Sequence, residues 1–220
     1  MEGIRKLMIA VPCYDTMRAE FVQSLVRLMT KLTADGILYE VKIISGTVVH
    51  TARDNLAKHA VNNGFGHVLW LDADMVFDDT ILEDLTISGK TEQILCGRFI
   101  SRHNPFLPTI FKRIEPSADR FDEDHIPGET FRICACGFAC VLTPVKVLGE
   151  VLNSNRGTAF LPTSRTSEDI AFCQRATGLG YEIWCEPTAR VGHVGAVTIW
   201  PEDGKRFRGE IQGLEGKTLN

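Results

Sequence analysis

Residues 67–77 read HVLWLDADMVF, an apolar run that ends in two carboxylates. Residues 67–71 have the composition and length of a buried strand, and Asp72 and Asp74 follow at its carboxyl end. Alternation along an extended chain would send both side chains toward the same side, where they could face one cation. Hard oxygen ligands suit Mg²⁺ or Mn²⁺, ions that commonly bridge protein carboxylates and substrate phosphates. An ordinary turn after a strand, where Asp is frequent, is the alternative.

Upstream of this run, strand signals alternate with helix signals. Residues 7–12 (LMIAVP) indicate a buried strand, and apolar positions at helical spacing follow it until Gly36. A second strand is expected at 39–45 and a second helix at about 51–62, before the strand at 67–71. This β-α-β-α-β order predicts a parallel sheet with covering helices, which binds ligands beyond the carboxyl ends of its strands. The segments at that edge are 12–15, 45–54 and 72–74.

The second half of the chain carries shorter strand signals, with helices expected after Pro144 and after Ser167. We therefore expect a mixed sheet there. The strands are predicted at 94–99, 109–113, 131–143 and 181–186. A chain of 220 residues without an evident repeat fits one domain, which we assign to residues 1–200.

Two long connections and the C-terminal end remain outside these elements. Residues 101–108, running into 115–129, and residues 153–167 form loops long enough to suggest acceptor recognition. Residues 201–220 form a tail that carries Lys205, Arg206 and Arg208. A tether of about a dozen residues from His193 reaches roughly 20 Å, so this tail could fold back over a bound diphosphate as a flexible lid.

Composition limits the classes of function. The chain is 44% hydrophobic and 24% charged, which is typical of a globular protein. Its longest N-terminal apolar run is far shorter than the roughly 20 residues of a membrane span, so we expect no span and a cytoplasmic location. The seven cysteines are expected to be free thiols, and the spacing of Cys134, Cys136 and Cys140 on one parity of a strand favours packing over zinc.

A net charge of −4 disfavours broad binding to a phosphate backbone. A local basic cluster at Arg98, Arg102 and His103 nevertheless leaves nucleic acid open as a partner.

Two further motifs supply candidate ligands and bases. His193 lies between glycines in ARVGHVG, and imidazole added to carboxylate oxygens suits Mn²⁺ better than Mg²⁺. Glu168 and Asp169 begin a predicted helix that Thr166 or Ser167 could cap. Acidic residues in a first turn are also stabilised by the helix dipole alone, so a purely structural role is the alternative.

Taken together, these motifs resemble the GT-A glycosyltransferases, especially the large family-two-like group. The resemblance covers roughly residues 7–200 and lies in the order VPCYD, LDADM, SEDIAFC and a late histidine. It implies that Pro12, Cys13, Tyr14 and Asp15 line the nucleoside. It implies that Asp72, Asp74 and His193 hold Mn²⁺ or Mg²⁺, with Ala73 between the aspartates against the donor. It also implies that Asp169, with Glu168 beside it, provides the catalytic base.

Two other stretches carry a weaker likeness to the same group. Ala52, Arg53 and Asp54 match an Ala-Arg-Asn stretch that often precedes the aspartates, with Asp54 in place of the asparagine. Arg53 is expected on the donor side of the cleft, with a surface ion pair as the alternative. Gly137, in CACGFACVLTP, matches a glycine that faces donor and acceptor, although a plain core strand explains it nearly as well.

The sequence thus predicts an α/β protein with a GT-A-like, Rossmann-type nucleotide-binding half and a mixed central sheet. The resemblance implies sugar transfer from a nucleoside-diphosphate sugar to an acceptor hydroxyl. Inversion at the anomeric carbon is expected from Asp169 as a base, and retention is the alternative, because retaining enzymes of the same fold can carry acidic residues nearby. The acceptor could be a glycan, a small molecule or a nucleic acid, and the sequence does not indicate the oligomeric state. A nucleotidyltransferase is the first alternative, although VPCYDTM lacks the glycine-rich basic loop typical of that class. A non-catalytic sugar-nucleotide or glycan-binding module of the same fold is the second.

Overall fold

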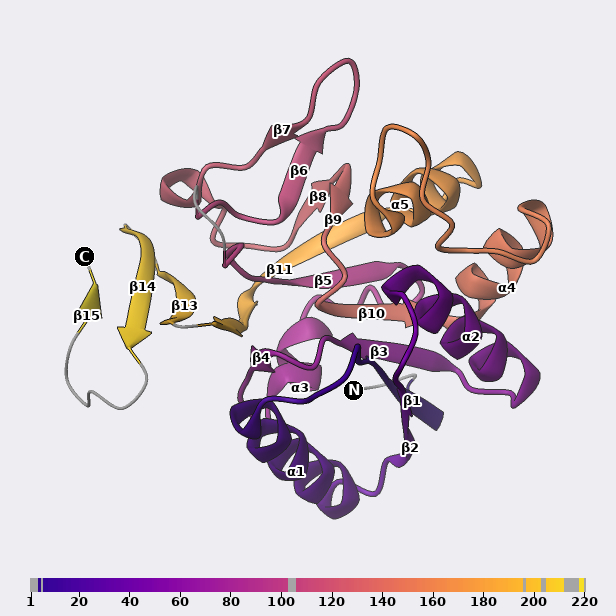
Figure 1. The fold of residues 1–220 in the computed structure, drawn as a ribbon, viewed down its shortest axis with the longest axis horizontal. Helices are drawn as coiled ribbons and strands as arrows, with labels where there is room; N and C mark the ends of the chain where they lie inside the picture. Colours follow the sequence, from indigo (N-terminus) through magenta and orange to yellow (C-terminus); the bar gives the residue numbers. More distant parts are fainter. Residues whose placement is uncertain are drawn as a thin grey trace.

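A mixed sheet of seven strands forms the centre of the computed structural model (Figure 1). Its strand order is β2-β1-β3-β10-β5-β11-β8. The strands are β1 (Lys6–Pro12), β2 (Leu38–Ile44), β3 (His67–Leu71), β5 (Ile94–Arg98), β8 (Phe131–Ile133), β10 (Cys140–Pro144) and β11 (Ile183–Arg190). The structure describes residues 4, 6–102, 106–195, 197–202, 205–211 and 218–219, with the backbone alone at 197–199 and beyond 201.

The direction of the strands confirms the predicted mixed sheet. β1 pairs in parallel with both β2 and β3, as the β-α-β-α-β order requires. β10 then runs antiparallel to both β3 and β5, whereas β11 is parallel to β5 and antiparallel to β8. The carboxyl ends of β1, β2 and β3 therefore meet at one edge of the sheet, as predicted.

Helices cover both faces of this sheet (Figure 1). α2 (Val49–Asn62), α4 (Val145–Ser154) and α5 (Glu168–Gly178) pack on one face, and α1 (Ala19–Ala34) and α3 (Ile81–Leu85) on the other. β3 shows how the sheet separates the two cores. Val68 and Trp70 point into the core beneath α2, whereas Leu69 and Leu71 point toward α1. This alternation on a fully buried strand explains why the run 67–71 is apolar throughout.

Two smaller sheets flank the central one. The first has the order β15-β14-β13-β12-β4 and the second the order β7-β6-β9. Their strands are β4 (Met75–Val76), β12 (Gly192–Val194), β13 (Val197–Glu202), β14 (Lys205–Ile211) and β15 (Thr218–Leu219), and β6 (Ile110–Arg113), β7 (Asp119–Arg120) and β9 (Ala135–Cys136). A short 3-10 helix, η1 (Glu123–His125), follows β7.

The prediction of one strand at 131–143 is wrong, because the chain changes sheets there. β8 belongs to the central sheet, β9 to the β7-β6-β9 sheet, and β10 returns to the central sheet. Gly137 lies at the crossing, where its N–H donates to the Thr109 carbonyl, and a Cβ on it would come 2.8 Å from Phe99 Cζ. The cysteines consequently do not share a face, since Cys136 is buried against Cys173 of α5, Cys140 on the α1 side, and Cys134 is exposed.

The backbone of the C-terminal tail forms part of the β15-β14-β13-β12-β4 sheet. β14 pairs antiparallel with β13 and lies beside η1 (Figure 1). The side chains of Lys205, Arg206 and Arg208 lie outside the described part of the structure, as does His103 of the predicted basic cluster. The lid therefore stays a prediction. Among the described helices, none has both the length and the apolar composition to span a membrane.

Candidate active site

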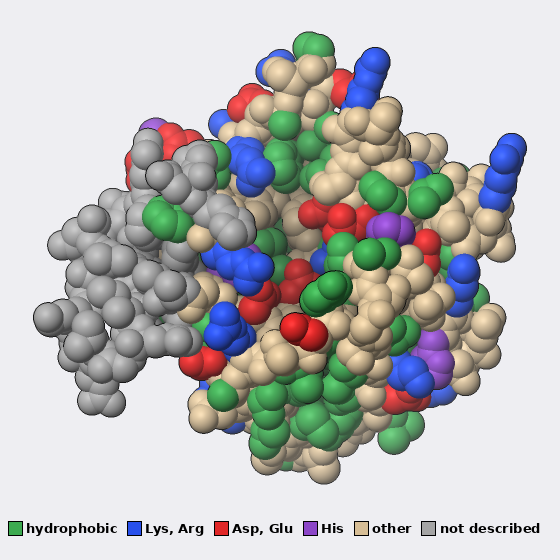
Figure 2. All heavy atoms as spheres, in the orientation of Figure 1, with side chains coloured by type: hydrophobic (Ala, Val, Ile, Leu, Met, Phe, Trp, Pro, Cys, Tyr) green, Lys and Arg blue, Asp and Glu red, His purple; other side chains and the backbone are tan. Residues whose placement is uncertain are grey.

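A large cavity lies at the carboxyl ends of β1, β2 and β3, where the parallel half of the sheet was expected to bind a ligand. It measures about 680 Å³. Its walls come from the β1–α1 loop, the segment that leads into α2, the turn after β3, and Arg102. In Figure 2, acidic side chains gather in a hollow near the middle of this face, with Lys or Arg side chains on one side of it.

Backbone hydrogen bonds fix the β1–α1 loop on one wall of this cavity. Cys13 N donates to the Ile44 carbonyl at 2.9 Å, and Gly46 N donates to the Tyr14 carbonyl at 2.8 Å, so the ends of β1 and β2 are tied together. All four residues predicted from VPCYD line the cavity. Tyr14 is 75% exposed at its rim, which leaves its ring free to stack against a planar group.

The two aspartates after β3 also line this cavity, together with Ala73. They do so in a turn, since Met75 N donates to the Asp72 carbonyl, and not by strand alternation as predicted. The turn aims the two carboxylates at different partners. Asp72 contacts Arg53 of α2, whereas Asp74 contacts Arg102 and His193.

His193, on β12, faces Asp74 across a short gap. Its Nδ1 lies 3.1 Å from the Ile100 carbonyl, which can only accept, so Nδ1 carries a proton and donates it. Its Nε2 then lies 3.4 Å from Asp74 Oδ2. An unprotonated imidazole nitrogen and a carboxylate oxygen are both acceptors, so this contact is favourable only when a proton or a metal ion lies between them.

This contact provides a test of whether the site fits a divalent cation. The described residues contain no group of three or more His, Cys, Asp or Glu side chains placed to hold a metal ion together. Of the three predicted metal ligands, Asp72 is held away from Asp74 and His193, because Arg53 binds both of its carboxylate oxygens. Asp74 and His193 fit as a two-residue site of the kind that Mg²⁺ or Mn²⁺ completes with substrate phosphates.

Arg53 joins the aspartate turn to the start of α5. Its side chain is only 3% exposed, and it donates to Asp72 Oδ1 at 2.9 Å and to Glu168 Oε1 at 2.5 Å. Its guanidinium also lies 5.7 Å from the ring centroid of Phe138. The guanidinium is on the same side of the sheet as Asp72, but Arg53 does not itself line the first cavity, so its contact with a donor stays a prediction. Its burial is unlike the exposed surface ion pair that was the alternative.

The surroundings shift the pKa values of the two aspartates in opposite directions. Burial raises the pKa of Asp72, and the positive charge of Arg53 counteracts only part of that shift. Burial also acts on Asp74, but the hydrogen bond and charge of His193, together with the charge of Arg102, outweigh it and lower the pKa of Asp74. Asp74 is therefore the more readily ionised of the two.

Removal of Arg53 should destabilise the protein, because it leaves two partly buried carboxylates without their partner. We expect Arg53→Met to lower the free energy of unfolding by about 2 to 3 kcal/mol, measured by urea denaturation. Lys58→Met, on the exposed side of the same helix, is the control and should change it little. An Arg53→Met variant as stable as the wild type would contradict this account of the ion pairs.

Asp54 is the predicted substrate-binding residue that the structure places elsewhere. Its carboxylate is buried, and Oδ1 accepts hydrogen bonds from Ala159 N at 2.7 Å and Phe160 N at 2.8 Å. It lines none of the cavities that the described residues form around Asp72 and Asp169. Asp54 therefore anchors the loop 153–167 to α2.

Replacement of Asp54 by alanine and by asparagine tests this anchor. Asp54→Ala should lower the free energy of unfolding by about 2 kcal/mol, because two buried N–H groups lose their acceptor. Asp54→Asn keeps an acceptor oxygen and should lose less than half as much. Faster proteolysis within 153–167 in Asp54→Ala, compared with Asp54→Asn, would locate the effect, and equal rates in the two variants would rule the anchor out.

A second cavity, of about 260 Å³, adjoins the first and shares Val49 and Asp72 with it. It holds Glu168 and Asp169 at the start of α5, and Gly137 forms part of its wall. Ser167 takes the predicted N-cap position of α5, but its hydroxyl donates to Asp169 Oδ1 and makes no cap hydrogen bond. Ile170 N donates to the same oxygen at 2.8 Å.

The two acidic residues of α5 therefore differ in their availability. Asp169 Oδ1 is occupied, which fixes the carboxylate in the cavity, and no hydrogen bond between described residues engages Oδ2. Glu168, by contrast, is held by Arg53. Asp169 is thus the better placed of the two to accept a proton from a molecule in this cavity.

Sequence reasoning missed several residues around these cavities. Arg18 lines the first cavity and Arg120 the second, and neither was named from the sequence. Arg18 could have been found, because it stands directly before the predicted first helix at the ligand-binding edge. Arg120 lies within the loop 115–129 that was expected to recognise the acceptor, but the acidic pattern of that loop did not single it out. Thr47 and Val48, which also line the first cavity, fall within the predicted edge segment 45–54.

No family model matches the chain, and no curated protein sequence matches it either. Solved structures do resemble it. A197 from STIV has 15% sequence identity and a TM-score of 0.63, over 99% of this chain and 98% of that chain. A mutant of Drosophila β1,4-galactosyltransferase 7, in complex with manganese, UDP-Gal and xylobiose, has 11% identity and a TM-score of 0.50, over 87% of this chain and 71% of that chain. These likenesses show the fold alone, which is a single-domain, GT-A-like α/β fold.

Proposed function

We propose that this chain is a metal-dependent glycosyltransferase that moves a sugar from a nucleoside-diphosphate sugar to an acceptor hydroxyl. One observation carries the proposal. A nucleotide-sized cavity that contains Asp74 and His193 adjoins a second cavity that contains Asp169, and Asp72 belongs to both. Sugar transfer needs a site for a diphosphate and a base for the acceptor hydroxyl next to each other.

The first cavity would bind the donor. Pro12, Cys13, Tyr14 and Asp15 would surround the nucleoside, with the exposed Tyr14 ring available to stack on the base. Arg18 and Arg102 line the same cavity and would neutralise the diphosphate. Arg102 already contacts Asp74, and a phosphate bound beside Asp74 would give the Arg102 guanidinium a second anionic partner.

Asp74 and His193 would hold Mn²⁺ or Mg²⁺, with Asp72 beside them. The fixed Nδ1–H of His193, which leaves Nε2 to face Asp74, supports this assignment, and Drosophila β1,4-galactosyltransferase 7 is in complex with manganese and UDP-Gal. The ion would act as a Lewis acid on the departing diphosphate. Arg53 would keep Asp72 oriented and hold Glu168 away from the acceptor.

Asp169 would act as the general base. Its Oδ1 is fixed by Ser167 and by Ile170 N, and its Oδ2 would take the proton of the acceptor hydroxyl as that oxygen attacks the anomeric carbon. Attack from the side opposite to the diphosphate inverts the configuration at that carbon. The order of the motifs favours an enzyme similar to the family-two group. The seven cysteines, all free thiols, fit a reducing compartment such as the cytoplasm.

A non-catalytic sugar-nucleotide-binding module is the second candidate. The ion pairs that hold Asp72 to Arg53 and Asp74 to Arg102 favour it, because they occupy both carboxylates. Both candidates predict donor binding, but only the enzyme predicts transfer.

Calorimetry with nucleoside diphosphates would test the binding part of the proposal. We expect one diphosphate to bind in the presence of Mn²⁺ and to bind at least about 10-fold more weakly with EDTA. The matching monophosphate, which cannot bridge the metal in the same way, is the control. Equal affinities with Mn²⁺ and with EDTA would rule out the metal-dependent site.

A further inference from the structure

A third cavity adjoins the cavity of Asp169 and is separate from the donor cavity. It measures about 530 Å³ and shares Phe111, Arg120, Ser167 and Ile170 with the cavity of Asp169. None of its lining residues belongs to the donor cavity. A molecule in this outer cavity would reach Asp169 without crossing the diphosphate site.

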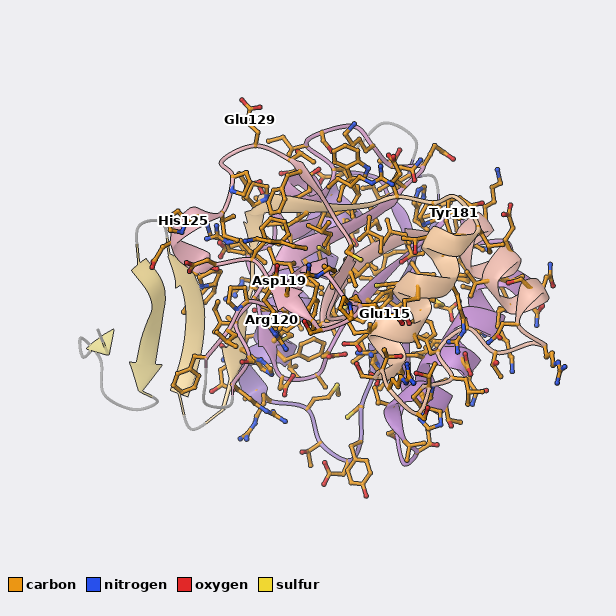
Figure 3. All side chains as sticks on the ribbon, turned by 90° about the horizontal axis from the view of Figure 1, so that it is seen from above. Glu115, Asp119, Arg120, His125, Glu129 and Tyr181 are labelled. Atoms are coloured by element: carbon orange, nitrogen blue, oxygen red, sulfur yellow. The ribbon has the colours of Figure 1, made fainter. Side chains whose placement is uncertain are left out.

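The charged residues of the outer cavity are Glu115, Arg120 and Arg165. Seen from above in Figure 3, Glu115 lies beside α5, and Arg120 lies next to Asp119, farther from that helix. The lining therefore carries one negative and two positive charges. Apolar surface from Phe111, Ile114 and Pro116 completes the wall and offers a face on which a sugar ring can rest.

Arg120 is held in place in a way that leaves it without a carboxylate partner. Its Nη1 donates to the Pro108 carbonyl at 2.6 Å, and its guanidinium carbon lies 4.5 Å from the centroid of the Phe111 ring. Within the described part of the chain, no carboxylate forms a salt bridge with it, although the charge of Asp169 acts on it across the shared cavity. Burial lowers the pKa of this guanidinium, and the charge of Asp169 counteracts only part of that shift, so an anionic ligand would compensate it further. Its planar fork suits a carboxylate or phosphate.

Arg165 adds a second cation to the same cavity from the loop 153–167. Its side chain is exposed, and the hydrogen bond described for this residue comes from its backbone N–H, which donates to Thr163 Oγ1. Asp54 anchors this loop at residues 159 and 160, so the position of the loop is tied to α2. The loop would therefore hold Arg165 near the outer cavity before any ligand binds.

We propose that the acceptor carries an anionic group, a carboxylate or a phosphate, which binds in the outer cavity between Arg120 and Arg165. This inference rests on the proposed function, because it places the reacting hydroxyl at Asp169. Arg120 lines both cavities, so the anionic group would lie next to the sugar ring that bears the hydroxyl. A role for Arg120 in stabilising the departing diphosphate does not fit, because it does not line the donor cavity.

Binding of matched sugars would test this without any transfer. The probes are methyl β-glucuronide against methyl β-glucoside, and glucose 6-phosphate against glucose, each titrated by saturation-transfer NMR. We expect at least one anionic probe to bind about 10-fold more tightly than its neutral partner. The two pairs of probes distinguish a carboxylate from a phosphate. Equal affinity of anionic and neutral sugars in both pairs would overturn the proposal.

Substitution of Arg120 tests whether this residue provides the preference for the anionic probes. In Arg120→Gln, the preference for the anionic probe should fall to less than about 3-fold, whereas Arg113→Gln, an exposed arginine on the neighbouring strand β6, should keep the full preference. A preference unchanged in Arg120→Gln would place the anion elsewhere and overturn the assignment. Folding of both variants is checked by their thermal unfolding.

The outcome separates this inference from the proposed function. If the anionic probes bind as predicted but no sugar nucleotide binds, the proposed function fails and the anion site remains. If a sugar nucleotide binds with Mn²⁺ but both anionic probes bind no better than neutral ones, only the acceptor inference fails.

Discussion

Asp169→Asn should lower kcat for sugar transfer by about 10² to 10⁴-fold, with the donor affinity unchanged. The amide has nearly the same shape as the carboxylate and can keep the hydrogen bonds from Ser167 and from Ile170 N. It cannot accept the proton of the acceptor hydroxyl. The measurement is the steady-state rate on an identified acceptor, together with the Kd of the nucleoside diphosphate in the presence of Mn²⁺.

The neighbouring acid is the control for this result. Glu168→Gln should lower kcat much less and should instead reduce stability, because Glu168 Oε1 accepts from the buried Arg53. Near-normal turnover in Asp169→Asn, with a large loss in Glu168→Gln, would move the catalytic base to Glu168. A loss of donor binding in Asp169→Asn would mean that the variant had disturbed the site as a whole.

Asp74→Ala should abolish the metal-dependent part of donor binding, which we expect to be at least about 10-fold in Kd. The residue lies in the turn after β3 and is the carboxylate that faces Nε2 of His193. Its removal leaves His193 alone as a ligand, whereas β3 and its core contacts stay intact. Calorimetry of the nucleoside diphosphate with Mn²⁺ and with EDTA measures the difference.

The exposed Asp78, a few residues further along the chain, serves as the matched control. Asp78→Ala removes the same charge from the same region and should leave the effect of Mn²⁺ unchanged. An effect of Mn²⁺ that persists in Asp74→Ala would place the metal elsewhere. Thermal unfolding close to that of the wild type is expected for both variants.

The parallel half of the fold could be predicted from sequence because its signals are long and regular. The apolar run of β3 and the helically spaced apolar residues of α1 are both longer than the apolar patterns of a turn or loop. The region 131–143 could not be predicted in the same way. Its apolar residues alternate as in one strand, but the crossing at Gly137 depends on the position of Phe99, which lies far away in the sequence.

The candidate site shows the same division between local and tertiary information. The aspartates, Arg53 and Asp169 were predicted because each follows a strand or begins a helix at one edge of the sheet. The partners of these residues were not, since Arg53 bridges Asp72 and Glu168 only after α2 and α5 have packed on the same face. Asp54 shows the converse, because its match to the last residue of an Ala-Arg-Asn stretch suggested a ligand contact, whereas its side chain reaches the backbone at residue 159.

Release of nucleoside diphosphate from a panel of sugar nucleotides tests the central claim most directly. The panel is incubated with Mn²⁺, with and without a mixture of neutral and anionic sugar acceptors, and the released diphosphate is measured. We predict release from one donor class, lost with EDTA and in Asp74→Ala, and increased by an acceptor only when Asp169 is present. No release and no binding with any donor in the presence of Mn²⁺ would contradict the account.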